Sequence, residues 1–375
     1  MCYYPFVDFA DNSFMDNKIY VKLKGHIYES GGYAKVNRNL IKGLTDLGVK
    51  VAVDPLGKDL GDYPKFNGLK FIAIDSLIPS IGNGSFGKYR ILYTTVESYT
   101  LNKGFVECCN SYNEIWTTSD FCAEIMKKEG VTRPIFVFPN TISSIYNDGV
   151  EFHEFNPELN SFVFLSVFNW SWRKGYDLLL KSYLSEFTEK DDISLLIISR
   201  VNGKESDIPK KTIDEYIKRM GATAHIRRIG KEIEEEDMPS IYKSCSAYVS
   251  FSRGEGFGIP FAESSLCGLP VIATNCSGHS MFLNSENSTL IEVDKPRKIT
   301  GNDQGVDYWL GLEMPALDTP SVLEAARGAL RGVYTHYTSA IEKNELLREQ
   351  ITDKFNIEKV SKDIKNRLEQ IWNKS

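Results

Sequence analysis

The sequence predicts an α/β protein made of two doubly wound domains, each with a parallel sheet covered by helices on both faces. Short apolar runs alternate with amphipathic helical stretches in two successive series, and such alternation is typical of parallel sheets. The chain of 375 residues also exceeds the length at which one hydrophobic core usually stops growing. We therefore expect two domains with a cleft between them.

The first series begins after an irregular N-terminal segment. Its opening helix, residues 33–47, is expected to end at Gly48, because glycine suits the left-handed conformation that follows many helices. Ser119 is a suitable N-cap for a later helix, and Gly130 is a suitable stop. The expected strands are residues 18–23, 49–53, 69–74, 91–94, 114–117 and 135–138.

The second series follows a stretch without regular periodicity. Residues 139–160 are rich in Pro, Asn, Asp and Gly, so the predicted domains are residues 1–155 and 156–356. From Thr319, with Pro320 opening a helix, helical periodicity continues almost to Trp372. The expected strands are residues 162–167, 193–199, 224–229, 247–251, 270–273 and 289–293, with helices near residues 175–184, 209–220 and 260–266.

Composition and charge exclude several classes of protein. Hydrophobic residues make up 42% of the chain and charged residues 25%, which is typical of a folded globular enzyme. The net charge of -6 provides no overall attraction to nucleic acid, so nucleic acid is a minor hypothesis. The seven cysteines form no C-x-x-C pair, and the chain shows neither a signal-peptide pattern nor a long apolar run. We expect a cytoplasmic protein, and a peripheral position at a membrane stays open.

A glycine-rich turn carries the most informative pair of carboxylates. Glu255 and Glu263 lie eight positions apart, where a buried strand gives way to a helix. The free N–H groups at the start of that helix favour an anion such as a diphosphate, and glycines let the backbone approach a ligand. The carboxylates would then bind hydroxyl groups of a nucleotide sugar. The expected contacts from the turn between them are Gly256, Phe257, Gly258 and Ile259.

Two cations follow the first strand of the second domain. Arg173 and Lys174 lie just before a predicted helix, at the edge of the sheet where open α/β folds bind ligands. Their charges suit a departing diphosphate. In the first domain, Gly31, Gly32 and Tyr33 occupy the equivalent loop and suit phosphate or acceptor contact. Glu97 follows another strand and is either a site acid or a capping carboxylate.

Other patterns give weaker signals. Residues 82–87 fit G-x-G-x-x-G, but a strand is expected after them, whereas a dinucleotide site or a P-loop needs a helix there. The five histidines show no close ligand spacing, no D-x-D pair occurs and no G-x-S-x-G turn is present. We therefore predict neither a metal site nor a hydrolase of that type.

These segments resemble the retaining glycosyltransferases of family four, which have the GT-B architecture of two Rossmann-like domains facing a cleft. Residues 253–263, RGEGFGIPFAE, and the CGLPVIAT stretch at 267–274 are similar to the family's E-x7-E segment and the strand after it. Lys174 and Gly175 resemble its lysine-glycine turn, Gly31 and Gly32 its first-domain glycine loop, and residues 114–119 another of its segments. The resemblance covers most of the chain. It implies that a C-terminal helix, residues 357–375, packs back on the first domain.

The resemblance implies metal-independent transfer of a hexosyl or pentosyl group from a UDP- or GDP-linked sugar to an acceptor hydroxyl. No cofactor is expected, since the nucleoside diphosphate sugar is a co-substrate. The acceptor would be a glycan, a glycolipid or a protein. The catalytic residues would be Glu255, Lys174, Arg173 and Glu97. The donor ribose would bind Glu263, and its base would lie near Ile229 and Gly230.

The chain departs from the family pattern at three positions. The family often has an arginine five residues before the lysine, where this chain has Asn169, a further candidate for donor binding. Arg173 would substitute for the missing arginine from a neighbouring position. Many members carry a first-domain histidine where this chain offers Glu97, and Met281 stands at a position that is often acidic. Three alternatives stay open: a GT-B nucleotide-sugar epimerase, a sugar-nucleotide-binding protein without catalysis, and a transferase acting on a modified nucleobase in DNA.

Overall fold

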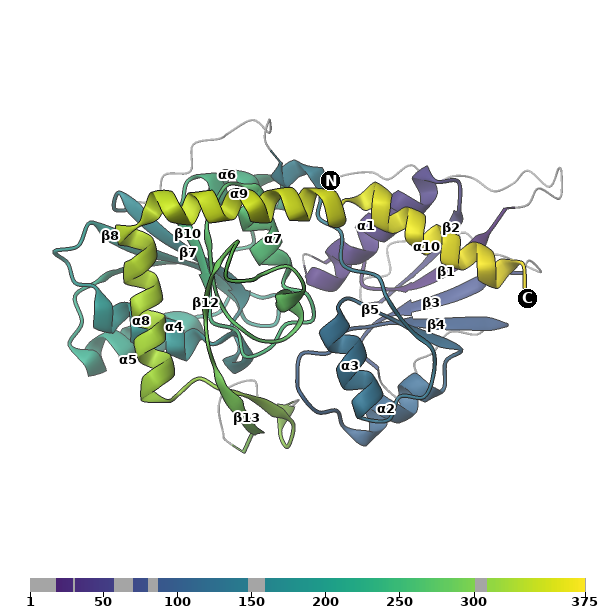
Figure 1. Cartoon of the computed structure of the whole chain (residues 1–375), viewed down its shortest axis with the longest axis horizontal. Coiled ribbons are helices and arrows are strands. Elements are labelled where there is room, and N and C mark those ends of the chain that lie inside the picture. Colours follow the sequence, from purple (N-terminus) through teal and green to yellow (C-terminus); the bar gives the residue numbers. More distant parts are fainter. Residues whose placement is uncertain are drawn as a thin grey trace.

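A computed structural model describes residues 18–29, 31–56, 70–79, 87–147, 159–300 and 309–374. Two six-stranded parallel sheets form two α/β units that lie side by side (Figure 1). This arrangement confirms the predicted fold class. The G-x-G-x-x-G segment and the interdomain boundary that we predicted fall largely outside the described residues. The segment after that glycine run, Tyr89–Tyr93, is a strand as expected.

The first sheet has the strand order β2-β1-β3-β4-β5-β6. Ser119 caps α3 as predicted, with its hydroxyl accepting from the backbone N–H of Cys122 at 3.4 Å. The strands are β1 (Tyr20–Gly25), β2 (Lys50–Pro55), β3 (Ile72–Ser76), β4 (Tyr89–Tyr93), β5 (Glu114–Thr117) and β6 (Ile135–Val137). The helices are α1 (Gly32–Asp46), α2 (Lys103–Asn110) and α3 (Asp120–Lys128), followed by the single turn η1 (Ser144–Tyr146).

The second sheet has the order β12-β11-β10-β7-β8-β9, which is the order typical of Rossmann folds. Its strands are β7 (Phe162–Asn169), β8 (Ile193–Arg200), β9 (His225–Ile229), β10 (Ala247–Ser250), β11 (Val271–Thr274) and β12 (Thr289–Ile291). Its helices are α4 (Tyr176–Glu186), α5 (Ile208–Met220), α6 (Met238–Lys243) and α7 (Ile259–Leu266), with short turns η2 (Trp172–Lys174), η3 (Glu235–Asp237) and η4 (Gly278–Met281). The helices α2 and α6 were not expected from the sequence.

An antiparallel hairpin that the sequence analysis missed follows the second sheet. It consists of β13 (Asp294–Lys298) and β14 (Glu313–Ala316). The hairpin reaches the first domain, because the backbone N–H of Tyr99 donates to the Glu313 carbonyl at 2.9 Å. The Glu313 N–H in turn donates to the Thr100 hydroxyl, also at 2.9 Å. The hairpin thus links the two domains along one side of their contact.

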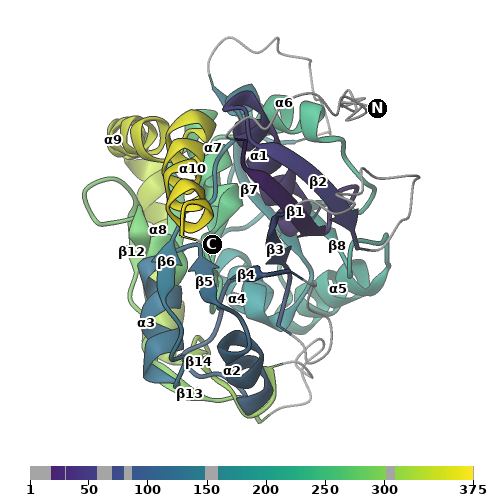
Figure 2. The same ribbon diagram turned by 90° about the vertical axis from the view of Figure 1, so that its right-hand side faces the viewer.

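Three consecutive helices end the chain: α8 (Pro320–Thr335), α9 (Tyr337–Lys354) and α10 (Ile357–Trp372). The α9 helix lies along the second domain, and α10 continues over the first (Figures 1 and 2). There Ile364 and Leu368 are buried in the same apolar core as Leu40 and Leu44 of α1. The chain therefore returns to its first domain. None of the helices within the described residues is long and apolar enough to cross a membrane.

Candidate functional site between the two domains

The site begins where the order of the second sheet reverses, between β7 and β10. Ligands of open α/β sheets bind at the carboxyl ends of such strands. The turn after β7 carries Arg173 and Lys174, and the turn after β10 contains Ser252. The two turns are joined by the Arg253 N–H, which donates to the Arg173 carbonyl at 2.7 Å. A Cβ atom at Gly175, where φ is +67°, would lie 1.7 Å from the Phe251 carbonyl oxygen, so only glycine fits there.

A buried ion pair fixes the relative position of the two turns. The Arg253 side chain is 1% exposed and bonds to both carboxylate oxygens of Asp177, at 2.8 Å each. It also donates to the Trp172 carbonyl at 2.6 Å and lies over the Trp172 ring. Although burial opposes ionisation, the bonds from Arg253 lower the pKa of Asp177. A bidentate pair holds direction as well as distance, so both turns are fixed as one unit.

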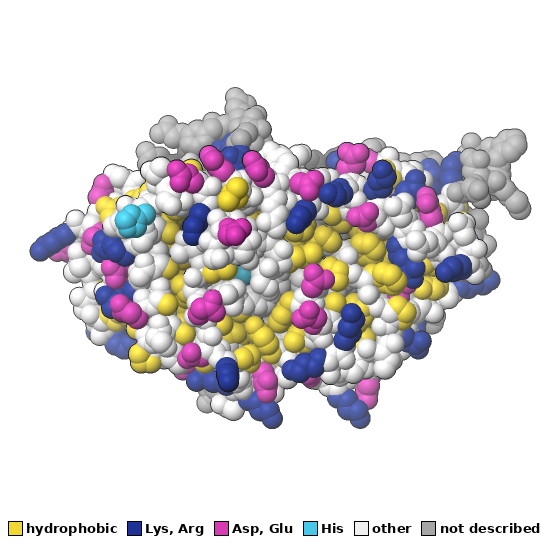
Figure 3. All heavy atoms as spheres, in the orientation of Figure 1, with side chains coloured by type: hydrophobic (Ala, Val, Ile, Leu, Met, Phe, Trp, Pro, Cys, Tyr) yellow, Lys and Arg dark blue, Asp and Glu magenta, His cyan; other side chains and the backbone are white. Residues whose placement is uncertain are grey.

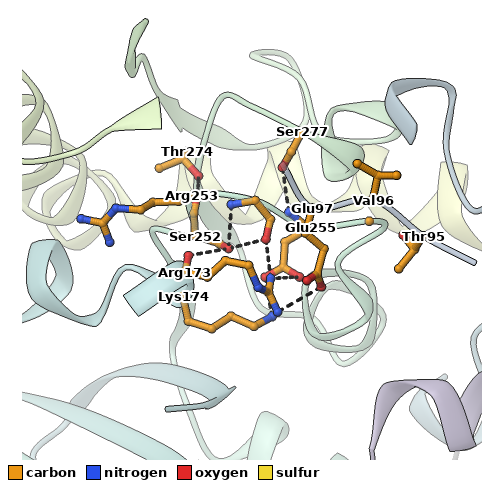
Figure 4. A network of polar contacts seen from close by, with 12 residues as sticks. Thr95, Val96, Glu97, Arg173, Lys174, Ser252, Arg253, Glu255, Thr274 and Ser277 are labelled. Atoms are coloured by element: carbon orange, nitrogen blue, oxygen red, sulfur yellow. Dashed lines mark hydrogen bonds and ion pairs between the residues drawn. The ribbon is translucent and has the colours of Figure 1, made fainter. Parts of the chain in front are cut away.

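The predicted cations and one predicted carboxylate meet directly. Lys174 Nζ lies 2.6 Å from Glu255 Oε1, and Arg173 Nη1 lies 3.3 Å from Glu255 Oε2. The second terminal nitrogen of the guanidinium contacts the first domain, where Arg173 Nη2 lies 3.0 Å from Glu97 Oε1. Figure 4 shows these four side chains pointing toward one another, while Arg253 points away from them. The four predicted catalytic residues therefore form one charged cluster.

The two carboxylates of this cluster have opposite electrostatic environments. Burial opposes the ionisation of Glu255, but Lys174 and Arg173 outweigh it and lower the pKa of Glu255 to about 2. Burial raises the pKa of Glu97, and its pairing with Arg173 does not fully offset this. Burial and the neighbouring Arg173 lower the pKa of Lys174. An anion entering the cluster would thus meet two cations that are already paired.

The first domain contacts backbone atoms of the glycine-rich turn. The Gly256 carbonyl accepts from the hydroxyls of Thr118 at 2.9 Å and Ser119 at 2.8 Å. A Cβ atom at Gly256 would lie 1.5 Å from Thr95 Oγ1, and one at Gly254 would lie 1.8 Å from the Glu97 carbonyl oxygen. The glycines of this turn therefore permit close docking of the domains. This contact lies beside the charged cluster.

Glu263 lies in a second polar cluster at the interface. Its side chain projects from α7 and is 3% exposed. Lys35 of α1 in the first domain approaches Glu263 Oε1 to 2.6 Å, and the Tyr242 hydroxyl donates to Oε2 at 3.0 Å. Lys35 also donates to the Tyr146 hydroxyl at 3.0 Å. One turn further along α1, Arg38 Nη2 lies 2.8 Å from Glu235 Oε2.

The other predicted residues of the glycine-rich turn play structural parts in this conformation. Phe257 is buried against the rings of Phe282 and Phe355, so its side chain belongs to the core. Gly258 stands at the N-cap of α7 with φ at +93°, a conformation that favours glycine. Ile259 begins α7 and faces Gly32, whose added Cβ atom would lie 3.8 Å from Ile259 Cδ1.

The remaining predicted residues lie at the ends of neighbouring elements. Gly31 is the N-cap of α1, Gly32 is its first residue, and the Tyr33 hydroxyl lies 3.5 Å from Thr94 Oγ1. Ile229 ends β9, and a Cβ atom at Gly230 would lie 2.5 Å from the guanidinium of Arg228. Asn169 is exposed and accepts from the Gly203 N–H at 3.4 Å. Within the described residues, Asn169 makes no hydrogen bond to the charged cluster.

Sequence reasoning missed the residues whose partners are remote in the chain. Lys35 and Glu263 are 228 positions apart, and Thr118 and Gly256 are 138 apart. No local pattern signals such contacts. The Arg253–Asp177 pair could have been suspected from the sequence. Arg253 precedes Glu255 by two positions and Asp177 follows Lys174 by three, and a charge inside a glycine-rich turn could have prompted a search for its partner.

Surface charge and metal-ligand chemistry add two observations. On the face shown in Figure 3, acidic and basic side chains are interspersed, without one extended patch of a single sign. In the part of the chain that the structure describes, no group of three or more His, Cys, Asp or Glu side chains could hold a metal ion.

Comparison with protein families places the second domain. Residues 160–301 match the family model described as Glycosyl transferases group 1. The segment contains both turns of the charged cluster and Glu263. An O-antigen chain mannosyltransferase B of Escherichia coli is 34% identical over 80 residues, which are 21% of this chain and 20% of that protein. The first curated relatives are matched over only 20% to 33% of their own length.

Solved structures extend the similarity to the whole fold. Sucrose-phosphate synthase from Thermosynechococcus elongatus aligns with a TM-score of 0.71 at 14% identity, covering 96% of this chain and 100% of that one. HepE from Anabaena, in complex with UDP and glucose, aligns with a TM-score of 0.65 at 12% identity, covering 94% and 100%. At these identities the similarity establishes the fold alone. The chain has the GT-B fold.

Proposed function

We propose that the protein transfers a glycosyl group from a nucleoside diphosphate sugar to an acceptor hydroxyl, with retention at the anomeric carbon and without a metal ion. The observation that carries this proposal is the charged cluster of Arg173, Lys174, Glu255 and Glu97 at the switch point of a group 1 glycosyl transferase domain. It combines two cations for a diphosphate with carboxylates for sugar hydroxyls.

Donor binding would exchange the partners within this cluster. The diphosphate would take Arg173 and Lys174 from the carboxylates that now pair with them. Glu255 would then be free to accept hydrogen bonds from the sugar hydroxyls, while the N–H groups at the start of α7 face the phosphates. Once the diphosphate has replaced the carboxylates as their partner, the two cations would stabilise the charge that develops on the leaving group.

The proposed reaction needs no enzyme nucleophile. The acceptor oxygen bonds to the anomeric carbon on the face from which the diphosphate departs, and the bond from that carbon to the phosphate oxygen breaks. The departing phosphate oxygen takes the acceptor proton. Docking of the first domain on Gly254 and Gly256 would exclude water and so limit hydrolysis of the donor.

The proposed substrates follow from the names of similar proteins and from the site. The relative from Escherichia coli is a mannosyltransferase of the O-antigen chain, and this favours a glycan or glycoconjugate acceptor here. The HepE complex contains UDP and glucose, so UDP-linked sugars join GDP-linked sugars as donors to test first. The acceptor would contact first-domain loops near Gly31, Gly32 and Tyr33.

A two-stage experiment tests the proposal. Thermal-shift measurements against UDP, GDP and ADP with their sugars should show one large selective shift. With that donor, Lys174→Ala and Glu255→Ala should each lower kcat by roughly 10²- to 10³-fold, as loss of other transition-state charge contacts does. Lys42→Ala, which removes an exposed ion pair within α1, is the matched control and should keep turnover. Full turnover in both site variants would refute the assignment.

Magnetic resonance of the donor pool separates the proposal from the nucleotide-sugar epimerase that shares this fold. A transferase leaves the donor sugar unchanged until an acceptor or water takes it. Isomerisation of the donor without an acceptor would refute the transferase function. Binding without any turnover across a broad acceptor panel would instead favour a protein that only binds sugar nucleotides.

A further inference from the structure

The buried carboxylate of Glu263 has a charged partner from the first domain, Lys35. Glu263 lies in the second turn of α7, and its carboxylate is almost fully buried. One oxygen contacts the Lys35 ammonium at 2.6 Å, and the other accepts from the Tyr242 hydroxyl at 3.0 Å. A buried carboxylate needs such partners, because removing one side of a buried pair leaves an uncompensated charge.

Lys35 is itself held in place. Its ammonium donates to the Tyr146 hydroxyl at 3.0 Å and lies 3.8 Å from Glu235 Oε1. Burial and the neighbouring Glu263 raise the pKa of both Tyr146 and Tyr242 well above the usual range, so both keep their hydroxyl protons. The lysine therefore approaches Glu263 from a fixed direction and from the first domain.

We propose that Lys35 is a positioning residue for the donor, because it orients Glu263 so that the carboxylate accepts hydrogen bonds from the ribose hydroxyls. This inference rests on the proposed function, in which Glu263 binds the ribose. A carboxylate has about four acceptor directions, and Lys35, Tyr242 and Tyr146 occupy three of them. The remaining direction suits a hydroxyl group of the ribose.

Lys35 also connects recognition of the ribose to docking of the domains. The ammonium belongs to α1, whereas Glu263 belongs to α7 of the second domain. The carboxylate is therefore fully positioned only when the first domain is in contact. Without Lys35 a buried anion would retain the Tyr242 hydroxyl and would turn toward other donors, which would weaken its selection of the ribose.

The neighbouring Arg38 provides a matched control. It lies one turn along the same helix and also crosses the interface, to Glu235 at 2.8 Å. Arg38→Met removes an interdomain ion pair but leaves the contacts of Glu263 with Lys35 and Tyr242 in place. Lys35→Met removes the contact with Glu263. The two variants therefore separate loss of an interdomain link from loss of the positioning contact.

The experiment measures how strongly the protein distinguishes ribose from deoxyribose. The probes are UDP and GDP, whichever binds more tightly, with the corresponding 2′-deoxy and 3′-deoxy nucleoside diphosphates, titrated by calorimetry. Wild type and Arg38→Met should prefer the ribonucleotide by roughly tenfold to a hundredfold, the usual range for hydrogen bonds to a charged group. Lys35→Met should reduce this preference to about threefold or less, which is less than one hydrogen bond to a charged group provides.

Kinetics and a double variant give a second readout. Lys35→Met should raise KM for the donor and leave kcat at saturating donor nearly unchanged, because it acts on binding and not on the reacting atoms. The double variant Lys35→Met with Glu263→Gln should prefer ribose over deoxyribose as much as Glu263→Gln alone does. Both changes act on the same interaction, which is that of residue 263 with the ribose.

Four outcomes decide whether Lys35 positions Glu263 for the ribose and whether the proposed function holds. An undiminished ribose preference in Lys35→Met would overturn the inference, and so would an equal loss in Arg38→Met. If wild type transfers sugar but does not distinguish ribose from deoxyribose, the inference fails while the proposed function stands. If no nucleoside diphosphate binds and no sugar is transferred, the proposed function fails and the inference with it.

Discussion

The two domains build their shared interface in different ways. The second domain presents charges on turns that are locked by buried contacts, above all the bidentate pair of Arg253 and Asp177. The first domain docks on these turns with backbone atoms, with small hydroxyls such as Thr118, and with single charged side chains such as Lys35 and Glu97. The difference shows that the charged turns are fixed within the second domain, whereas the first domain adds single partners to them on contact.

The first prediction removes the buried ion pair that fixes the turns of the second domain. Asp177→Ala should destabilise the protein by about 3–5 kcal/mol, because Arg253 would stay buried without its partner. Asp46→Ala, which removes an exposed ion pair with Lys42 in the first domain, should change stability by about 0.5 kcal/mol or less. Chemical denaturation of both variants measures the difference. Equal, small effects would show that the buried pair does not anchor the turns.

The second prediction uses pH to compare one carboxylate from each domain. The pKa of Glu255 is lowered to about 2, so its ion pairs stabilise the fold above the ordinary value of 4.5. This stability, on the order of 3 kcal/mol, should be lost as pH falls from about 5 toward 2. The pKa of Glu97 is raised, so the fold should lose stability as pH rises through that raised value.

Unfolding free energies across pH check both signs. Glu255→Gln should flatten the acid side of the stability profile, and Glu97→Gln should flatten the decline above its ordinary pKa. Profiles of both variants that run parallel to the wild-type profile would contradict the opposite environments of the two carboxylates.

The third prediction weakens the contact between the first domain and the glycine-rich turn. Gly256→Ala would place a methyl group 1.5 Å from Thr95 Oγ1, and the overpacking should cost about 1–3 kcal/mol of interdomain docking. We expect a larger radius of gyration by small-angle X-ray scattering. Gly328→Ala in α8, where an added Cβ atom meets nothing within 4 Å, is the control and should leave the scattering unchanged. Identical scattering from both variants would mean that the turn tolerates a side chain.

The fold could be predicted largely from local patterns. Alternating apolar runs gave the strands of both sheets, and caps such as Ser119 and Thr319 marked helix starts correctly. The hairpin of β13 and β14 escaped prediction because its sequence, with Pro296 and several charged residues, lacks the alternation of a strand. The short helices α2 and α6 also lack a long periodic stretch.

The candidate site could be predicted only in part. The cluster of Arg173, Lys174 and Glu255 was accessible because each residue follows a strand end, and parallel strands bring their carboxyl ends together. The contact between Lys35 and Glu263 was not accessible, because it depends on how two separate domains dock. Sequence periodicity describes each domain by itself and contains no information on that arrangement.

The stereochemistry of the product decides whether the protein is a metal-independent retaining glycosyltransferase. Proton magnetic resonance can follow the anomeric configuration of the product formed from the donor that the thermal-shift screen identifies, with EDTA present throughout. We expect continued turnover and a product with the same anomeric configuration as the donor, because Arg173 and Lys174 would stabilise the leaving diphosphate on the face that the acceptor attacks. A product of inverted configuration, or turnover that requires a divalent metal ion, would contradict it.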